Sequence, residues 1–343
     1  MKPFVGITMG DPAGIGPEII AKAANEPAVY AECHPVVIGE KRILEEAVHM
    51  AGLNLEVKAI RDIRTASYYR GAINVIDLKN IGSQKIIYGT VNADCGRASG
   101  EYIERAIDLA MRKEISAIVT APINKESFYL GGYGKKYTGH TEMLASLTGS
   151  ENVSMVLVHG RLRVIHVTAH VSMRKALDLI TTGNILKTIR VAHEACRQLG
   201  IDRPKIAVAG LNPHCGENGL MGDEEIHEIK PAVEKAVAEG LDVAGPIPAD
   251  TLFPKGEAGV FDIIVALYHD QGHIPVKLKG FKWENNAWSD VRGVNITFGL
   301  PIIRTSVDHG TAYGKAGKGR ADEKSLLDAI HYAVLIAKHR NFG

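Results

Sequence analysis

The sequence has little excess of either charge, because 40 Lys and Arg residues balance 39 Asp and Glu residues and give the 343-residue chain a formal net charge of +1. A protein that binds nucleic acid through a basic surface is therefore not expected. No apolar run approaches the roughly 20 residues that cross a bilayer, and residues 1–9 lack the long apolar region of a secretory signal. We expect a cytoplasmic protein without nucleic-acid or membrane partners.

Cysteine is scarce as well. The four cysteines lie far apart, with no CxxC pair, at Cys33, Cys95, Cys196 and Cys215. This spacing is typical of free thiols in a reducing compartment rather than of a disulfide framework. The sequence also has no internal repeat, no low-complexity tract and no long Pro/Ser linker, so two domains would be in close contact. At roughly 150 residues per domain, the length predicts about two.

Short β-branched runs alternate with longer segments of helical periodicity. Eight runs predict strands, and several are apolar throughout, as in strands covered on both faces: 5–8, 36–38, 73–76, 115–119, 154–158, 164–167, 206–208 and 263–266. Apolar residues recur at helical spacing over 102–113, 185–199 and 325–337. This alternation predicts an α/β fold with a largely parallel sheet.

Two glycine-rich segments stand out, at 10–18 and 305–319. Neither is a Rossmann or Walker fingerprint. The first follows a predicted strand, with Pro17 in the first turn of a predicted helix. Its spacing favours a tight strand-to-helix turn over a loop that lines an active-site crevice. The second offers backbone N–H groups that could hold a phosphate or contact a nucleotide, and a solvated loop is the alternative.

Three of the 14 histidines lie at or near the carboxyl ends of predicted strands. His170 ends the run 164–169, His214 follows the strand at 206, and His269 follows the strand at 263. In an open α/β sheet this edge is where ligands bind. Three imidazoles brought together there would suit a catalytic metal centre with open positions. The alternative is that each is a hydrogen-bonded loop residue.

Other polar residues suit an anionic substrate. Thr141 could bind an oxyanion and His140 a phosphate or carboxylate, although Thr141 is also a candidate helix N-cap. Lys277, Asn295 and Arg304 occur in apolar surroundings, where polar groups are usually paired or functional. Together they suit a phosphorylated or carboxylated substrate. For Arg304 the alternative is a structural ion pair with Asp or Glu.

Taken together, these motifs resemble the 4-hydroxythreonine-4-phosphate dehydrogenase family. The resemblance runs from Val5 to about Asp322 and rests on the segments 10–18, 120–125, 139–142, 210–214, 268–272 and 293–297, with 299–301 and 304–312 extending it. The first segment and residues 309–312 also resemble the wider isocitrate and isopropylmalate dehydrogenase group.

For the fold, the resemblance implies a homodimer of α/β chains, each with two non-Rossmann α/β/α domains and a cleft between them. We expect residues 1–130 plus 305–343 to form the first domain, with the cofactor-binding segments. Residues 131–304 would form the second, with metal, substrate and dimer-interface residues.

For the site, the resemblance implies one divalent metal (Zn, Mg, Mn or Co) at the dimer interface, with ligands from both subunits: His170, His214 and His269. It implies substrate binding by His140, Thr141, Lys277, Asn295 and Arg304, and catalytic roles for Lys277 and Asp270. NAD, with NADP as the alternative, would contact the segment 308–319, and specifically Asp308, His309, Gly310, Thr311 and Gly317.

The implied reaction is oxidation at C3 of a 4-phosphorylated four-carbon hydroxy acid, followed by loss of carbon dioxide. Two features, His273 and the long stretch 281–290, resemble the branch that acts on D-threonate or D-erythronate 4-phosphate in sugar-acid catabolism. The alternative substrate is 4-phosphohydroxy-L-threonine in vitamin B6 biosynthesis. From the residues alone, a metal-dependent phosphohydrolase and a non-catalytic protein that binds phosphorylated metabolites stay open.

Overall fold

The computed structural model describes residues 2–82, 85–284 and 287–340. The chain forms two compact units: one comprises 1–153 with 299–343, and the other comprises 154–298. Residues 131–153 and 299–304, expected in the second domain, lie in the first unit. None of the helices in the described part of the chain is long and apolar enough to span a membrane.

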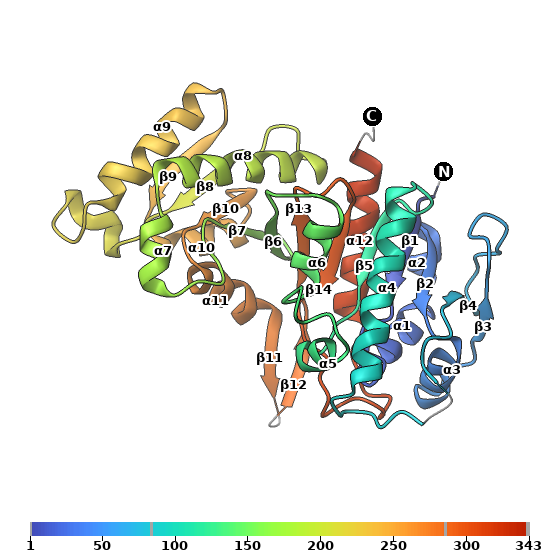
Figure 1. Ribbon diagram of the computed structural model, residues 1–343. Helices are drawn as coiled ribbons and strands as arrows, with labels where there is room; N and C mark the ends of the chain where they lie inside the picture. Colours follow the sequence, from blue (N-terminus) through green and yellow to red (C-terminus); the bar gives the residue numbers. More distant parts are fainter. Residues whose placement is uncertain (1, 83–84, 285–286, 341–343) are drawn as a thin grey trace. The chain divides into compact units, whose positions relative to one another are not determined.

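The first unit is built on six parallel strands in the order β3-β4-β2-β1-β5-β14. Their bounds are β1 Phe4–Thr8, β2 His34–Gly39, β3 Glu56–Ala59, β4 Ala72–Asp77, β5 Ala117–Thr120 and β14 Arg304–Val307. In Figure 1 the red strand β14 and helix α12 (Lys324–His339) lie beside elements coloured blue and cyan. The C-terminal segment therefore completes the unit that the N-terminal segment begins.

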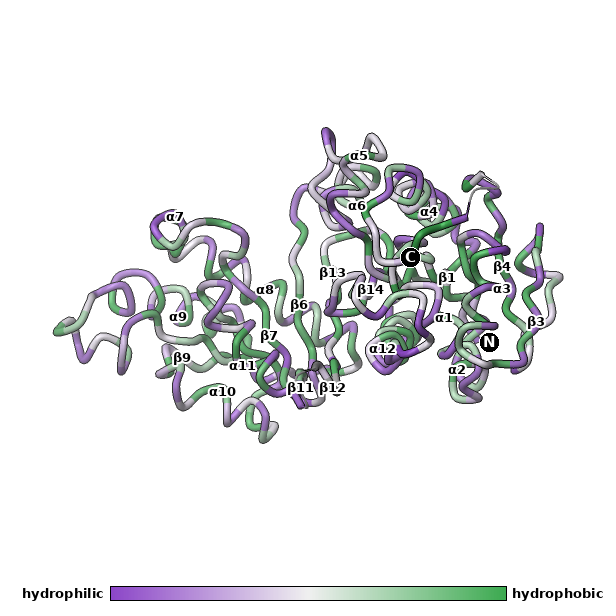
Figure 2. The backbone as a smooth tube through the Cα atoms, turned by 90° about the horizontal axis from the view of Figure 1, so that it is seen from below, coloured by the Kyte–Doolittle hydropathy of each residue, from purple (hydrophilic) through white to green (hydrophobic). Residues whose placement is uncertain are grey.

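Helices cover both faces of this sheet. Figure 2 shows α4, α5 and α6 on one face and α1, α2 and α12 on the other. The bounds not yet given are α1 Gly16–Ala23, α2 Pro27–Glu32, α3 Lys41–Met50, α4 Ala93–Met111, α5 Lys125–Leu130 and α6 His140–Leu147. Pro17 lies in the first turn of α1, as predicted.

The second unit has a mixed sheet in the order β13-β6-β7-β10-β8-β9. Its strands are β6 Ser154–His159, β7 Leu162–His166, β8 Ile206–Ala209, β9 Val243–Ile247, β10 Ile263–Ala266 and β13 Val294–Phe298. Strands β7, β10, β8 and β9 are parallel, whereas β6 is antiparallel to both of its neighbours. The loop between β6 and β7 has only two residues, Gly160 and Arg161, which is too short for a parallel crossover.

The helices of the second unit lie on either side of its sheet. Helices α8 and α9 lie on one face and α10 and α11 on the other (Figure 1). The bounds in this unit are α7 Met173–Leu179, α8 Thr182–Gln198, the turns η1 Pro213–Asn218 and η2 Glu225–Ile229, α9 Lys230–Ala238, α10 Ala249–Glu257, α11 His269–Gly280, and a separate hairpin of β11 Phe281–Glu284 and β12 Ala287–Val291. Leu162, Val164, Leu252, Phe253 and Val276 belong to one core cluster between the sheet and α10 and α11.

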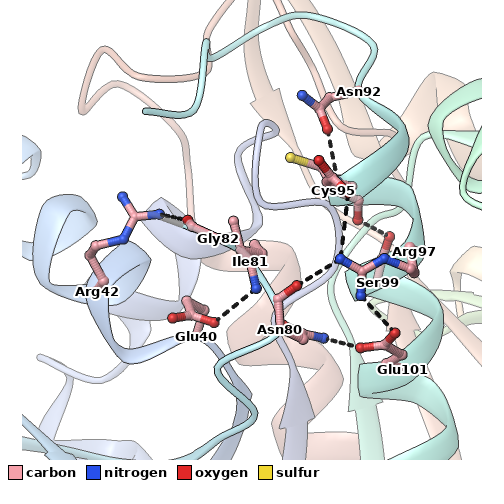
Figure 3. Close-up of polar contacts among 11 residues, drawn as sticks. Glu40, Arg42, Asn80, Ile81, Gly82, Asn92, Cys95, Arg97, Ser99 and Glu101 are labelled. Atoms are coloured by element: carbon pink, nitrogen blue, oxygen red, sulfur yellow. Dashed lines mark hydrogen bonds and ion pairs between the residues drawn. The ribbon is translucent and has the colours of Figure 1, made fainter. Parts of the chain in front are cut away.

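Helix α4 begins nine residues before the predicted 102–113 segment. Asn92 caps it, because its side-chain oxygen accepts a hydrogen bond from the N–H of Cys95 (3.0 Å). Arg97 extends the anchoring by donating to the carbonyl of Asn80 (2.8 Å) and to the carboxylate of Glu101 (2.9 Å). Figure 3 shows these contacts, which fasten the loop after β4 to the first half of α4.

The first half of α4 carries no apolar periodicity because it packs closely on α5. A Cβ atom on Gly96 would overlap the carbonyl oxygen of Ser127 in α5. Neighbouring positions are also small and buried, at Ala98, Ser99 and Gly100. Close backbone approach, rather than large apolar side chains, therefore joins the two helices, and a periodicity of apolar residues does not reveal it.

We predict that Gly96→Ala lowers the free energy of unfolding by about 3 kcal/mol, the upper end of the usual cost of overpacking. The matched control is Gly183→Ala in the first turn of α8, where a Cβ would meet no atom of the described residues within 4 Å. That variant should keep or raise stability by up to about 1 kcal/mol through helix propensity. Urea denaturation measures both, and equal effects would show that Gly96 is not constrained by α5.

Candidate active site

The three sequence-predicted histidines follow three adjacent parallel strands of the second unit. His170 comes after β7, His269 after the central strand β10, and His214 after β8. Because the strands are parallel, their carboxyl ends meet at one edge of the sheet. In open α/β sheets this edge is the usual place for ligands.

His269 is oriented for ligation. It is the first residue of α11, and its Nδ1 lies 2.7 Å from Oδ1 of Asp270. A proton on Nδ1 donated to this carboxylate leaves the lone pair on Nε2, and metal-binding histidines usually donate their other ring N–H to a carboxylate or carbonyl in this way. The ring of His170 lies beside it, with the two ring centroids 5.8 Å apart. Asp270, expected as a catalytic residue, is placed to orient His269.

His166 and His273 lie next to His170 and His269, although the sequence does not predict them in the site. His273 stacks on His269 with ring centroids 3.6 Å apart, and its Nδ1 lies 3.0 Å from the carbonyl oxygen of His269. His166 lies beside His273, with the two ring centroids 4.6 Å apart. Burial, reinforced by the neighbouring imidazoles, lowers the pKa of His166 to about 3 and that of His273 to about 4. Both rings are therefore neutral near pH 7.

The sequence pattern indicates on which face of its helix or strand each of His273 and His166 lies. His269, His273 and Lys277 are spaced by four residues, which places them on one face of α11. His166 alternates with Leu162 and Val164 along β7, so it shares the face of the sheet on which α11 packs. Recognising the contact requires knowing which helix covers that face, and this is tertiary information.

Gly272 makes room for His166. A Cβ on Gly272 would collide with Nε2 of His166 and come within 2.6 Å of Cγ1 of Val164. The first turn of α11 can therefore lie close against β7 only because residue 272 lacks a side chain. This close approach brings His273 against the strand histidine.

His214 lies in a strained turn. Four non-glycine residues in η1 have positive φ: His214 (52°), Cys215 (56°), Glu217 (44°) and Asn218 (56°). The left-handed conformation costs roughly 1–2 kcal/mol for each such residue. Strain of this kind persists only where the surroundings fix the backbone, and it is concentrated at functional sites. The His214 side chain itself is exposed.

Buried side chains link the three histidine-bearing segments. Gln271 accepts a hydrogen bond from the N–H of Leu267 (2.7 Å) and donates from Nε2 to the carbonyl of Gly210 (2.7 Å). Thr168 donates from its hydroxyl to the carbonyl of Leu267 (2.8 Å). The segments after β7, β10 and β8 are thereby held together at one sheet edge.

The donor chemistry of His170, His214 and His269 fits a divalent transition metal such as zinc. The Asp270 contact leaves Nε2 of His269 available, which also fits. Within the described residues of one chain, however, no three His, Cys, Asp or Glu side chains are grouped so that they could hold a metal ion. The chain thus supplies suitable ligands without assembling them into a complete set by itself.

In the first unit, a second polar group lies where β1, β5 and β14 end. Asp11, which is fully buried, accepts hydrogen bonds from the N–H of Ala13 (2.8 Å) and the hydroxyl of Tyr313 (2.8 Å). The Tyr313 hydroxyl also lies 3.1 Å from Oγ of Ser127. Burial raises the pKa of Asp11. These contacts join the glycine-rich segment 10–18, the segment after β5 and the glycine-rich segment 305–319.

The residues expected to bind the cofactor follow β14. Asp308 and His309 are partly buried and Gly310 is exposed, while the carbonyl of Thr311 accepts a hydrogen bond from the N–H of Ile15 (3.1 Å). The N–H of Gly317 donates to Oε1 of Glu18 (2.6 Å), and Lys318 N–H lies 3.2 Å from the same oxygen. The N–H groups of 317 and 318 are therefore engaged by a carboxylate.

His140 and Arg304 lie close together in this unit. Arg304 is only 4% exposed and donates from Nη2 (2.8 Å) and Nε (3.2 Å) to Oγ1 of Thr120. Burial lowers its pKa to about 10, and Glu142 partly offsets this. Nε2 of His140 is buried and has no hydrogen-bond partner among the described residues. Burial, followed by the charge of Arg304, holds the pKa of His140 well below the usual range. A neutral imidazole beside a buried guanidinium is a pair of groups that can bind an anion.

Three other expected substrate-binding residues occupy defined positions. Thr141 lies inside the first turn of α6, so the N-cap alternative was wrong: Gly139 is the N-cap, and the helix begins at His140. Asn295 pairs with Leu157 in the middle of β13. Nζ of Lys277 lies 5.2 Å from the ring centroid of Phe281, on the face of α11 that carries His269.

Comparison with known proteins identifies the family. Residues 31–333 match the family described as pyridoxal phosphate biosynthetic protein PdxA. The chain belongs to the PdxA family. A relative in Cupriavidus necator, named D-threonate 4-phosphate dehydrogenase, is 49% identical over 339 residues that cover 98% of each chain.

Solved structures agree with this placement in the family. The structure of a 4-hydroxythreonine-4-phosphate dehydrogenase from Klebsiella pneumoniae is 44% identical with a TM-score of 0.86, and one from Burkholderia phymatum is 46% identical with a TM-score of 0.82. Each comparison covers 98% of both chains. The chain is therefore a dehydrogenase of the PdxA family with the α/β architecture of these structures, and the phosphohydrolase and non-catalytic alternatives are excluded.

We predict that Arg304→Lys weakens binding of inorganic phosphate, because lysine keeps the charge and loses the planar fork. The expected loss is about 1–3 kcal/mol, the scale of a charge-assisted hydrogen bond, measured by titration calorimetry. Arg340→Lys is the control, since Nη2 of Arg340 donates to the carbonyl of Leu300 (2.7 Å) elsewhere in the unit. If Arg304→Lys has a lowered melting temperature but unchanged phosphate affinity, Arg304 is only a structural residue.

Proposed function

We propose that the chain catalyses NAD-dependent, divalent-metal-dependent oxidation and decarboxylation of D-threonate or D-erythronate 4-phosphate, giving dihydroxyacetone phosphate and CO₂. The observation that carries the proposal is the placement of His170, His269 and His214 after three adjacent parallel strands. The choice of substrate is supported by the identity to a relative named for D-threonate 4-phosphate. The alternative is oxidation of 4-phosphohydroxy-L-threonine to 3-amino-2-oxopropyl phosphate in pyridoxal 5'-phosphate biosynthesis.

In this proposal His170, His214 and His269 hold the metal, with ligands drawn from both subunits of a homodimer. When bound, the metal would supply Lewis acidity at the substrate hydroxyl, and NAD would be the hydride acceptor. Asp270 keeps His269 in the tautomer whose Nε2 carries the lone pair. Cross-linking by Gln271 limits how far the segments bearing His269 and His214 can move relative to each other.

The anionic groups of the substrate need cationic or donor partners. The proposed ones are His140, Thr141, Lys277, Asn295 and Arg304. His140 is neutral near pH 7 because of its lowered pKa, so it would bind an anion as a hydrogen-bond donor. Lys277 would act by proton transfer to the substrate or by its charge alone.

Formation of NADH, followed at 340 nm with added Zn²⁺, Mg²⁺, Mn²⁺ or Co²⁺, tests the proposal. We predict that D-threonate or D-erythronate 4-phosphate gives a kcat/KM at least about tenfold above that of 4-phosphohydroxy-L-threonine, the scale on which a site distinguishes one substituent. The three compounds share the phosphate and the carboxylate and differ at C2. Preference for the amino compound would favour the vitamin B6 alternative, and no NADH from any of them would contradict the proposal.

The segment 308–319 is proposed to bind NAD, and Gly310 provides a specific test. Gly310 is exposed, and a Cβ there would meet no atom within 4 Å in the part of the chain that the structure describes, so Gly310→Val should leave the fold intact. We predict that the variant raises the KM for NAD at least about tenfold, while the KM for substrate changes little, because the side chain would occupy cofactor space.

Gly183→Val is the control for this test, because Gly183 is exposed and equally open but lies outside the segment 308–319. It should leave both Michaelis constants near the wild-type values. If Gly310→Val and Gly183→Val behave alike, or if both constants rise together in Gly310→Val, the cofactor does not pass close to Gly310.

A further inference from the structure

One buried carboxylate anchors the segment that leads into η1. Glu225 is 3% exposed. Its Oε1 accepts hydrogen bonds from the backbone N–H of Leu211 (2.7 Å) and of Asn212 (2.7 Å), and its Oε2 accepts one from Nδ2 of Asn212 (2.8 Å). Three donors thus converge on a single side chain that comes from the π-helical turn η2.

The same carboxylate also lies against η1 itself. A Cβ on Gly210 would come within 3.4 Å of Oε1 of Glu225, and one on Gly216 within 3.1 Å of Oε2. Glu225 therefore occupies the space between the end of β8 and the middle of the left-handed turn. His214 lies between these two glycines in the sequence, at φ 52°.

We propose that Glu225 is a positioning residue that holds the left-handed turn η1, and with it the His214 imidazole, in place for metal binding. The proposal rests on the proposed function, because that function assigns His214 as a ligand. Left-handed backbone is unfavourable for non-glycine residues, so η1 needs fixed contacts to persist. Glu225 provides them by binding the two backbone N–H groups immediately before Pro213.

Glu224 offers a matched control one residue away. Its Oε2 accepts a hydrogen bond from the same Asn212 Nδ2 (2.6 Å), and it makes no hydrogen bond to the N–H of Leu211 or Asn212 in the described structure. It is also less buried than Glu225. A change at Glu224 therefore alters the local charge equally without releasing the backbone.

The experiment compares the full-length wild type with Glu225→Leu, Glu225→Gln, Glu224→Gln and His214→Ala. Zn²⁺ alone is titrated into each metal-free protein by calorimetry, and amide hydrogen exchange is measured at residues 211 and 212. Melting temperatures establish that each variant is folded at the titration temperature. Glu225→Gln retains an amide oxygen that can accept both backbone hydrogen bonds, so it tests for partial rescue.

We expect Glu225→Leu to weaken zinc affinity by about 10- to 100-fold, the usual effect of losing a group that orients a metal ligand, with faster exchange at residues 211 and 212. Glu225→Gln should fall between this variant and wild type. Glu224→Gln should bind zinc within about threefold of wild type with unchanged exchange, and His214→Ala should show the largest loss. If Glu225→Leu does not fold, Glu225→Gln is the variant that tests the proposal. Its zinc affinity should then be about three- to tenfold weaker than that of wild type.

Two failures are distinguishable. If His214→Ala binds zinc like wild type, the three-histidine site of the proposed function is wrong, and with it the role of Glu225. If His214→Ala loses zinc while both Glu225 variants retain wild-type affinity, the site stands and the positioning role is overturned. A lowered melting temperature with unchanged zinc affinity would show that Glu225 is merely structural.

Discussion

The site in the second unit depends on the two hydrogen bonds that the side chain of Gln271 makes. Its amide accepts from the N–H of Leu267 at the end of β10 and donates to the carbonyl of Gly210 at the end of β8. Gln271 lies in the first turn of α11, two residues after His269, so its contacts also fix the start of that helix. Both partners are backbone groups at a buried sheet edge, where an unsatisfied donor or acceptor is costly. The histidine-bearing segments thus share one rigid frame.

In the first unit, two carboxylates hold the glycine-rich segments together. Asp11 and Glu18 are both buried, and they come from the glycine-rich segment that follows β1. Asp11 accepts a hydrogen bond from Tyr313 and Glu18 accepts one from the N–H of Gly317, so both hold the second glycine-rich segment. The backbone donors at 317 and 318 are thereby occupied. Parts of the segment that remain exposed, such as Gly310, are the better candidates for contact with a cofactor.

The α/β class, the eight named strands and the sheet edge that carries His170, His214 and His269 follow from the sequence, because strand periodicity and loop position are local properties. The short strands β3, β9, β13 and β14, the hairpin strands β11 and β12, and the antiparallel direction of β6 do not follow from it. Nor does the contact between His166 and His273, since it depends on which helix covers which sheet face. The turn η1 contains four non-glycine residues with positive φ, and Glu225, whose carboxylate accepts a hydrogen bond from the segment before the turn, lies outside it, so apolar periodicity does not reveal this contact.

In the proposed function, His170, His214 and His269 bind one metal ion. The most direct measurement is a crystal structure of the full chain grown with Zn²⁺, with data collected on both sides of the zinc absorption edge. We expect one anomalous peak per site, from a zinc ion bound by imidazole nitrogens of these three histidines, with Nε2 as the ligating atom of His269. A zinc ion bound without His214, or held by His166 and His273 in place of His170 and His269, would contradict it.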